Sequence, residues 1–551
     1  MFKKLAFVIK PNKCYICDNT LLSYSQTHNT RLATKVFNED SAAVAAMTLQ
    51  EWQHAKPFNE MPTMSPWRMV CNLLPGGKYS KLDSSQLMLS FKDDMGHIIR
   101  FKGLFGGPDI VITHNPQDFR KALSNSGNWP ARPGMEFLLY HRNKLRADFF
   151  QGVEGLIPTQ GEKWGNFRTI VNPVLMQPRN VRWYFRKMSA VNKELVARIR
   201  DIRDPNSLEV PHNFEDYINR FTLESVSVVA LDKQLGLLRK HSDNESAKEL
   251  LTSLTILFTY AMVYEFGPST WKYYQTATFK KLMSALDSIT DITTAFIDEA
   301  IARIEEDRRN GIKDRTENEK SVIEKLIKID RRVAVVMAID MLMAGVDTAA
   351  SALAGILLCL AKNPEKQAKL REEVMTILPY KNSDFTESNI KNMPYVRACI
   401  REAMRMYPLL VGNARGQFED IVLSGYRVPK GTLVYTIYTS LLRDDKYFLR
   451  ANEYLPERWL RPTKDMERND GTMESPHALR VSDPFVFLPF GYGSRSCIGR
   501  RVLEMELHLA IARLIRNFNV EFNYSTEKAF KSYLINVPNI PLKFKFTDVE
   551  I

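Results

Sequence analysis

The chain has 551 residues, of which 44% are hydrophobic and 25% charged, so it can bury a large core and is not a disordered protein. Its net charge of +13 at pH 7 favours an acidic partner or an anionic membrane surface. Nucleic acid is disfavoured as a partner, because no basic tract interleaved with aromatic residues occurs. Six cysteines are too few for a secreted, disulfide-stapled scaffold of this length, so a reducing compartment is expected.

The first 38 residues form a basic, hydroxyl-rich segment with six Lys or Arg side chains and a single acid. This composition is typical of a mitochondrial transit peptide, and a frayed basic tail is the alternative. No apolar run of 18 residues occurs there, so an N-terminal membrane anchor is not expected. Cys14 and Cys17 form a CxxC without a second pair of cysteines or histidines, which is weak support for a metal site. We predict a transit peptide at 1–35, a linker at 36–56 and one globular domain at 57–551.

Apolar spacing along the domain predicts a mainly α fold with small β-sheets. Residues 161–377 show mostly the 3.6-residue period of helices. Short strands are predicted before this region, at 97–103 and 110–113, and after it, at 426–428 and 433–437. No internal repeat and no clear linker between two domains occur within this part of the sequence.

One segment, Val333–Leu360, is apolar over 28 residues with only two charges and is long enough to span a bilayer. Its two acids, Asp340 and Asp347, are seven positions apart and therefore face nearly the same side of a helix. Each would cost roughly 2.5–3.5 kcal/mol at a bilayer centre. We therefore predict a buried helix through the middle of the protein, which ends at Asn363-Pro364.

A glycine-rich loop at residues 490–499, FGYGSRSCIG, presents a cysteine after a long polar stretch at about 461–484. Apolar spacing after Gly499 predicts a helix, so Cys497 precedes a helix N-terminus, where the dipole favours a thiolate. A thiolate can be a nucleophile, a redox group or a metal ligand, including the axial ligand of haem iron. No histidine lies at the spacing of a known catalytic triad, and the loop alone leaves these alternatives open.

This loop resembles the haem-binding loop of the cytochrome P450 family, whose pattern is FxxGxxxCxG with arginine common two positions before the cysteine. The resemblance implies a mainly α haem-thiolate fold with a long central helix over haem b. It also implies that Cys497 is the axial iron ligand and that Phe490 and Arg495 contact the cofactor.

Two further elements resemble the structural motifs of that family. Glu402 and Arg405 form an ExxR, and Arg458 lies in a PERW that resembles the family's PERF element. The resemblance implies a buried charge network of these three residues that holds the proximal face of the haem. Two other ExxR matches, at 305–308 and 306–309, are interpreted as solvated surface pairs.

The sequence WGNFR resembles the WxxxR motif on the family helix that approaches the haem edge. Its Trp164 and Arg168 both carry hydrogen-bond donors that suit a propionate carboxylate. Arg415 and Arg495 match the other propionate-binding positions of the family.

Within the apolar segment, AGVDT resembles the oxygen-activation signature of the family. The resemblance implies that Gly345 lets oxygen and substrate approach the backbone, that Thr348 hydrogen-bonds dioxygen, and that Asp347 relays protons. Isomerases and dehydratases of the family often lack the acid–alcohol pair, and a non-catalytic haem sensor or carrier would not need it. The pair therefore favours a monooxygenase.

The resemblance covers residues 57–548, and CIGRRVLEMELHLAIARLIRNF is similar to the mitochondrial branch of the family. That branch implies electrons from NADPH through a reductase and an acidic [2Fe–2S] ferredoxin, and a peripheral site on the matrix side of the inner membrane. The protein is then expected to be a monomer. The ferredoxin would bind a basic surface that includes Arg397, Arg401, Arg500 and Arg501.

Two stretches, 148–181 and 226–238, resemble an insect mitochondrial subgroup associated with foreign compounds such as insecticides. We therefore expect oxidation of lipophilic foreign compounds, with ecdysteroid hydroxylation as the alternative. The substrate pocket is expected to be lined by 129–160, 251–265, the central helix and 409–413.

Overall fold

The structure is a computed structural model that describes residues 50–103, 107–240, 243–266, 270–311, 316, 319–461, 479, 481 and 483–550. The predicted transit peptide, the CxxC and most of the polar stretch at 461–484 lie outside these residues. Residues Ala55–Ile551 form one compact unit, which is described below.

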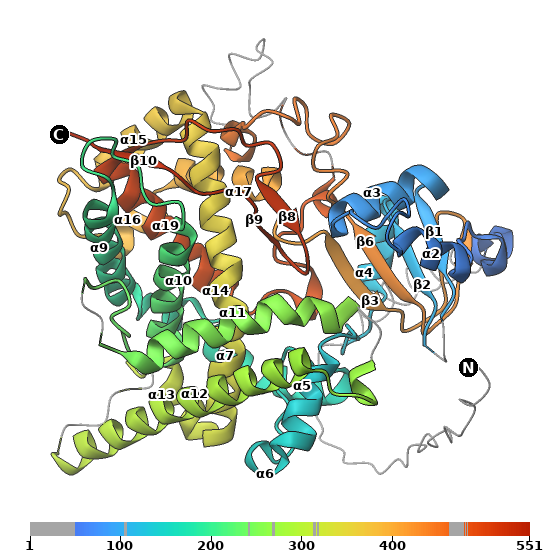
Figure 1. Ribbon diagram of the computed structural model, residues 1–551, viewed down its shortest axis with the longest axis horizontal. Helices are drawn as coiled ribbons and strands as arrows, with labels where there is room; N and C mark the ends of the chain where they lie inside the picture. Colours follow the sequence, from blue (N-terminus) through green and yellow to red (C-terminus); the bar gives the residue numbers. More distant parts are fainter. Residues whose placement is uncertain are drawn as a thin grey trace, which may run out of the picture. The chain divides into compact units, whose positions relative to one another are not determined.

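Helices make up most of this unit, as predicted (Figure 1). They are α2 (Pro66–Leu73), α3 (Ser84–Met95), α4 (Pro116–Ser124), α5 (Glu136–Tyr140), the π-helix η2 (His141–Leu145), α6 (Ala147–Phe150), α7 (Gly161–Leu175), α8 (Pro178–Arg182), α9 (Phe185–Ile202), α10 (Phe214–Ala230), α11 (Glu245–Phe266), α12 (Ala277–Arg309), α13 (Val322–Ile329), α14 (Arg331–Lys362), α15 (Pro364–Ile377), α16 (Glu387–Lys391), α17 (Pro394–Met406) and α19 (Arg500–Asn517). Short 3-10 turns are η1 (Phe58–Glu60), η3 (Thr270–Lys272), η4 (Pro456–Trp459), η5 (Pro484–Val486) and η6 (Gly493–Arg495).

The strands form one four-stranded sheet and three two-stranded sheets. They are β1 (Ile98–Phe101), β2 (Ile110–Thr113), β3 (Gly412–Gly416), β4 (Ile421–Leu423), β5 (Tyr426–Val428), β6 (Leu433–Ile437), β7 (Phe518–Glu521), β8 (Phe530–Ser532), β9 (Asn536–Pro538) and β10 (Lys545–Asp548). The four predicted strands are confirmed as β1, β2, β5 and β6.

The four-stranded sheet has the order β1-β2-β6-β3. Strand β1 is antiparallel to β2, β2 is parallel to β6, and β6 is antiparallel to β3. The parallel pair joins strands from distant parts of the chain, with Ile110 opposite Leu433. Figure 1 shows this sheet beside the helical part of the unit, with α3 and α4 next to it.

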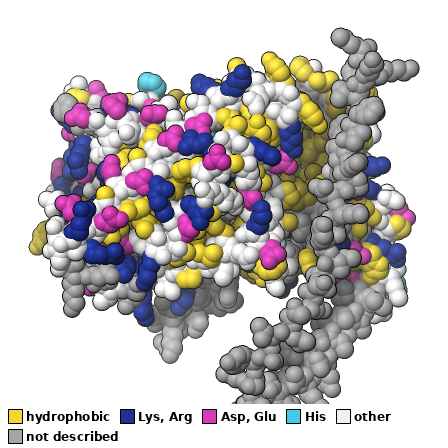
Figure 2. All heavy atoms as spheres, turned by 90° about the horizontal axis from the view of Figure 1, so that it is seen from below, with side chains coloured by type: hydrophobic (Ala, Val, Ile, Leu, Met, Phe, Trp, Pro, Cys, Tyr) yellow, Lys and Arg dark blue, Asp and Glu magenta, His cyan; other side chains and the backbone are white. Residues whose placement is uncertain are grey.

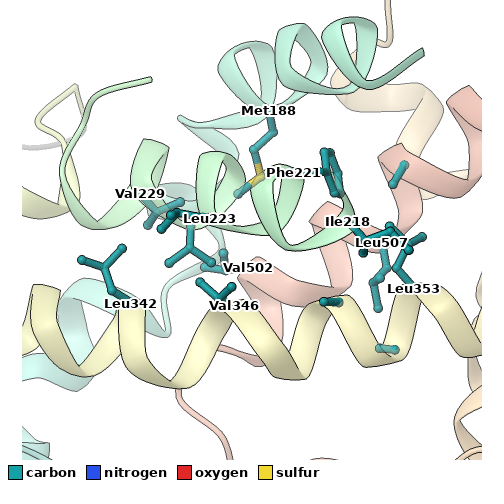
Figure 3. Close-up of a cluster of buried hydrophobic side chains, with 14 of the residues drawn as sticks. Met188, Ile218, Phe221, Leu223, Val229, Leu342, Val346, Leu353, Val502 and Leu507 are labelled. Carbon is teal, nitrogen blue, oxygen red and sulfur yellow. The ribbon is translucent and has the colours of Figure 1, made fainter. Parts of the chain in front are cut away.

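Helix α14 forms the centre of the main hydrophobic core and confirms the predicted buried helix. It alone among the described helices is long and apolar enough to cross a bilayer, and 72% of its most apolar stretch is buried in the protein. In Figure 3, Leu342 and Val346 of α14 face Leu223 and Val229 of α10. The helix is therefore covered by protein on most sides, as a core helix requires.

Candidate functional site

The cysteine loop closes tightly just before α19. Gly491 and Gly493 have φ values of +71° and +69°, a region that side-chain-bearing residues rarely adopt. The backbone N–H of Cys497 donates to the carbonyl of Phe490 at 2.9 Å, and α19 begins at Arg500. The predicted position of the cysteine in front of a helix N-terminus is confirmed.

Cys497 is accessible although protein surrounds it. The residue is exposed, yet burial raises the pKa of its thiol. Backbone N–H groups of Gly499 and Arg500 and the guanidinium of Arg168 act in the opposite direction. The residue therefore keeps accessible surface within protein surroundings, which leaves the thiol available to a bound group.

Four arginines from separate segments gather around this loop: Arg132, Arg168, Arg415 and Arg495. Arg168 donates to the carbonyl of Ser496 at 2.9 Å, and Arg415 donates to that of Tyr492 at 3.2 Å. Arg495 donates to the carbonyls of Pro130 and Thr159, at 2.9 and 2.7 Å, and to the side chain of Gln160 at 3.0 Å. The structure thus brings the three predicted arginines together and adds Arg132, which the sequence analysis did not single out.

Protein carboxylates balance this cluster only in part, through the charge of Glu265 on Arg132. Among the described residues, none of the four arginines forms an ion pair, and the Nε groups of Arg168 and Arg415 are buried without a hydrogen-bond partner. Burial, followed by repulsion from the neighbouring guanidiniums, lowers the pKa of Arg495 to about 8. Burial and the charge of Arg132 lower that of Arg415 to about 10. Unpaired guanidinium donors of this kind suit the carboxylates of a bound anion.

Trp164 supports two of these arginines from helix α7. Its ring is buried, and its centroid lies 3.9 Å from the guanidinium carbon of Arg495 and 5.9 Å from that of Arg168. Trp164 and Arg168 are four positions apart, so both project from one face of α7. Phe490 is half-buried, and the guanidinium carbon of Arg500 lies 5.2 Å from its ring centroid.

The central helix carries an opening in its otherwise buried surface. Ala344 is exposed, and Gly345, Asp347 and Thr348 are half-buried, whereas Met343, Val346 and Ala349 are buried. The Thr348 hydroxyl donates to the carbonyl of Ala344 at 2.7 Å. Burial raises the pKa of Asp347 to about 7, and its Oδ2 is buried without a partner among the described residues. An alcohol and an acid that titrates near neutrality thus lie side by side on α14.

Gly345 packs against the neighbouring helix. A Cβ at this position would lie 2.7 Å from Cγ2 of Val226 on α10, which is closer than side chains approach one another. The glycine therefore allows α10 and α14 to pack closely. Its expected role in the approach of oxygen stays a prediction.

The predicted charge network is buried and complete. Glu402 accepts two bonds from Arg405, at 2.8 and 3.0 Å, and one from Arg458 at 2.9 Å, and all three side chains are fully buried. The indole of Trp459, which the sequence analysis did not assign, donates to the same carboxylate at 2.8 Å. The network ties α17 to η4. The alternative ExxR pairs near the end of α12 are exposed, as predicted.

The four predicted ferredoxin-binding arginines, Arg397, Arg401, Arg500 and Arg501, are all exposed, on α17 and α19. Arg401 stacks on Trp459, with its guanidinium carbon 4.4 Å from the ring centroid. Burial and the charge of Arg500 both lower the pKa of Arg401, so these two cations lie near each other. Arg500 also pairs with Glu504 at 2.8 Å.

The loop presents an accessible cysteine beside buried guanidinium donors without a partner among the described residues, and α14 carries an acid–alcohol pair. Together these features fit a haem-thiolate protein. The sequence matches the cytochrome P450 family over residues 61–546. The chain therefore belongs to the cytochrome P450 family, whose haem iron has a thiolate ligand, and it is a P450 monooxygenase.

Similar proteins cover nearly the whole chain. This chain is 63% identical over 500 residues to cytochrome P450 CYP12A2 of Musca domestica. The matched residues cover 91% of this chain and 93% of the relative. It is 54% identical to the probable cytochrome P450 12a5, mitochondrial, of Drosophila melanogaster, with 91% and 92% covered. It is 44% identical to the probable cytochrome P450 12c1, mitochondrial, of the same fly, with 93% and 96% covered.

Proposed function

We propose that this protein is a mitochondrial monooxygenase that inserts one oxygen atom of O2 into a lipophilic small molecule, with Cys497 as the iron ligand. The observation that carries the proposal is the accessible Cys497 beside four guanidiniums that form no ion pair with the residues that the structure describes. When bound, haem with an axial thiolate supplies the chemistry that cleaves the O–O bond. The protein's own residues hold the cofactor, position protons and exclude water.

The arginine cluster and Trp164 would hold the two carboxylates of haem. The unpaired Nε groups of Arg168 and Arg415 are available as donors, and Trp164 fixes the plane of the Arg495 guanidinium. Arg132 belongs to this set because its charge acts on Cys497, Arg415 and Arg495. Phe490 would pack beside the macrocycle.

Asp347 and Thr348 would manage protons on the opposite side of the site. A carboxyl whose pKa lies at about 7 can both hold and release a proton at physiological pH. The Thr348 hydroxyl directs its hydrogen at Ala344, which leaves its oxygen lone pairs to accept a bond from the site. This pair is the reason to prefer a monooxygenase to a haem sensor or carrier.

Electrons would reach the protein from NADPH through a reductase and an acidic [2Fe–2S] ferredoxin. The exposed arginines on α17 and α19 are suited to steer such a partner. Labelled dioxygen tests the proposal, because NADPH- and ferredoxin-dependent turnover should place one labelled atom in the product and the other in water. Haem-containing protein that binds ligands but forms no labelled product would support the sensor alternative instead.

The proposed location is the matrix side of the inner membrane, with residues 1–35 as a cleaved transit peptide, 36–56 as a linker and 57–551 as the catalytic domain. Two of the relatives are named as probable mitochondrial P450 proteins. Exposed apolar side chains support peripheral membrane contact, above all Trp67 on α2 and Tyr273 after η3, which are 76% and 89% exposed. Figure 2 shows hydrophobic side chains among Lys and Arg on one face. The test is to incubate the full chain with isolated mitochondria. If residues 1–35 are not cleaved off and the chain is not protected from added protease, the proposed location is contradicted.

For the substrate, we propose a lipophilic foreign compound such as an insecticide, with ecdysteroid hydroxylation as the second candidate. The sequence segments similar to the foreign-compound subgroup support the first. A spectral binding screen that compares lipophilic insecticides with ecdysteroid precursors separates the two candidates, because a bound substrate shifts the haem absorption band.

A further inference from the structure

Asp340, the other acid of the central helix, forms a buried ion pair with a residue almost 200 positions earlier. Its Oδ1 accepts a bond from Arg142 Nη2 at 2.7 Å, and the two side chains are 2% and 0% exposed. Arg142 is presented by the short π-helix η2, and π-helical turns are frequent at functional positions. The proposed oxygen chemistry does not use this pair, so its position needs another explanation.

The pair holds the backbone of one loop. Asp340 Oδ2 accepts the backbone N–H of Leu156 at 2.6 Å, and Arg142 Nη1 donates to the carbonyl of Glu154. Gly155, between them, has φ +83°, and a Cβ there would lie 2.3 Å from Arg142 Nη1 and 2.5 Å from Asp340 Oδ2. The loop backbone is therefore wrapped onto the ion pair, and only glycine fits at its centre.

The same loop supplies most of the acceptors of Arg495. The guanidinium donates to the carbonyls of Leu156 and Thr159, at 3.4 and 2.7 Å, and to Oε1 of Gln160 at 3.0 Å. A continuous set of hydrogen bonds thus runs from Asp340 through Leu156 to Arg495.

We propose that Arg142 and Asp340 are positioning residues that fix the loop 154–160 and, through it, the Arg495 guanidinium at the cofactor carboxylates. This inference rests on the proposed role of Arg495 in cofactor binding. It predicts that the pair controls how firmly the protein retains haem. Asp340 would act on the cofactor without contacting it, in the same way that outer partners orient the ligands of metal sites.

The test is the rate of haem transfer from the full-length holoprotein to excess apomyoglobin. Asp340→Asn should release haem roughly tenfold faster, because outer partners of a bound group typically change affinity 10–100-fold. Glu224→Gln is the matched control. Glu224 is also fully buried and holds backbone N–H groups, at Leu235 and Leu237, but it lies on α10 and makes no bond to the Arg495 loop. Its variant should transfer haem at the wild-type rate.

A second variant keeps the test valid if Asp340→Asn folds poorly. Arg142→Leu combined with Asp340→Leu removes both charges, a change that buried pairs often tolerate. It should unfold near the wild-type temperature but still release haem faster, because Leu156 has lost its anchor. Wild-type release rates in both the Asn variant and the double Leu variant would overturn the inference.

Arg495→Gln separates this inference from the proposed function. If it does not speed haem release, the cofactor role of Arg495 fails. If it does, and the Asp340 variants do not, only the positioning role fails. Asp340→Asn in the Arg495→Gln background should add no further acceleration, because both changes act through one guanidinium. Additive acceleration would contradict the pathway through Arg495.

Discussion

The guanidinium carbon of Arg495 lies 3.9 Å from the ring centroid of Trp164, within a cluster of four arginines that form no ion pair among the described residues. Such proximity of like charges is unfavourable unless an anion is bound. Cytochrome P450 proteins bind haem, which carries two carboxylates, and we propose that these carboxylates balance this cluster. The first prediction follows from that balance.

We predict that haem affinity falls as the pH rises above 8. Arg495 and Arg415 have pKa values of about 8 and 10 without a bound anion, and an anion beside them would raise both. Binding therefore favours the protonated arginines, so its full strength is present below pH 8 and is lost progressively above it. Haem transfer rates between pH 7 and 10 measure this effect, with circular dichroism to show that the fold persists. Arg495→Gln should make the haem transfer rate less dependent on pH near pH 8, where Arg495 titrates. A haem transfer rate that does not change with pH in the wild type would contradict the prediction.

Replacing Asp347 should stabilise the protein at alkaline pH while reducing coupled turnover. Burial raises the pKa of this carboxyl from its ordinary value to about 7, so the fold disfavours its ionised form. That cost is absent below pH 4, grows between pH 4 and 7, and is full above pH 7. Asp347→Asn should therefore gain on the order of 1–3 kcal/mol at pH 8 and almost nothing at pH 4, after allowance for partial exposure. Thermal unfolding at the two pH values, with product formed per NADPH, is the measurement. If Asp347→Asn changes the stability equally at pH 4 and pH 8, the pKa of Asp347 is not raised in the folded protein.

Breaking the Glu402 network should be costly. Glu402→Ala would leave Arg405 and Arg458 as uncompensated buried cations, which typically costs about 3–5 kcal/mol. Denaturant unfolding of the holoprotein measures the loss. Glu305→Ala, in an exposed ExxR of α12, is the control and should change stability by less than about 0.5 kcal/mol.

Gly345→Ala should destabilise the protein by roughly 1–3 kcal/mol because its methyl group would overlap Val226. Val226→Ala in the same chain should restore part of the loss by making room on α10. If stability recovers but turnover does not, the glycine is also needed on the oxygen side of the helix. Failure of Val226→Ala to relieve any of the destabilisation would rule out the packing explanation.

Charge reversal on the basic surface of α17 and α19 should weaken the binding of ferredoxin without changing the haem site. Arg397→Glu is expected to raise the KM for ferredoxin about tenfold and to make the rate less sensitive to salt, because it removes long-range attraction. Arg309→Glu is the matched control, because Arg309 is also exposed but lies at the end of α12. If both variants raise the KM to the same degree, net charge rather than a specific surface is responsible.

Local patterns made much of the fold and site predictable. Three patterns each lie within a single helix or loop and could therefore be interpreted from neighbouring residues alone. They are the glycines around Cys497, the apolar run of α14 and the ExxR spacing. Arg132 could not be found in this way, because its role depends on the convergence of distant segments. Its one local signal is its place between two prolines, Pro130 and Pro133, which fix the backbone but do not identify a partner.

Long-range pairing was the main part that the sequence did not reveal. The partner of Asp340 lies on a π-helix 198 positions away, and the parallel pairing of β2 with β6 joins strands more than 300 positions apart. Neither relationship leaves a periodic pattern in the chain. Seven-residue spacing correctly placed Asp340 and Asp347 on one helix. It could not show that Asp340 forms an ion pair while one oxygen of Asp347 has no hydrogen-bond partner in the described part of the chain.

The central claim, that Cys497 is the thiolate ligand of haem iron, is tested most directly by the Soret band of the reduced, CO-bound protein. The wild type should show the red-shifted band that thiolate ligation produces, and Cys497→His should abolish the shift while CO still binds. A wild-type band at the position typical of histidine-ligated haem, or a red shift that survives in Cys497→His, would contradict the claim.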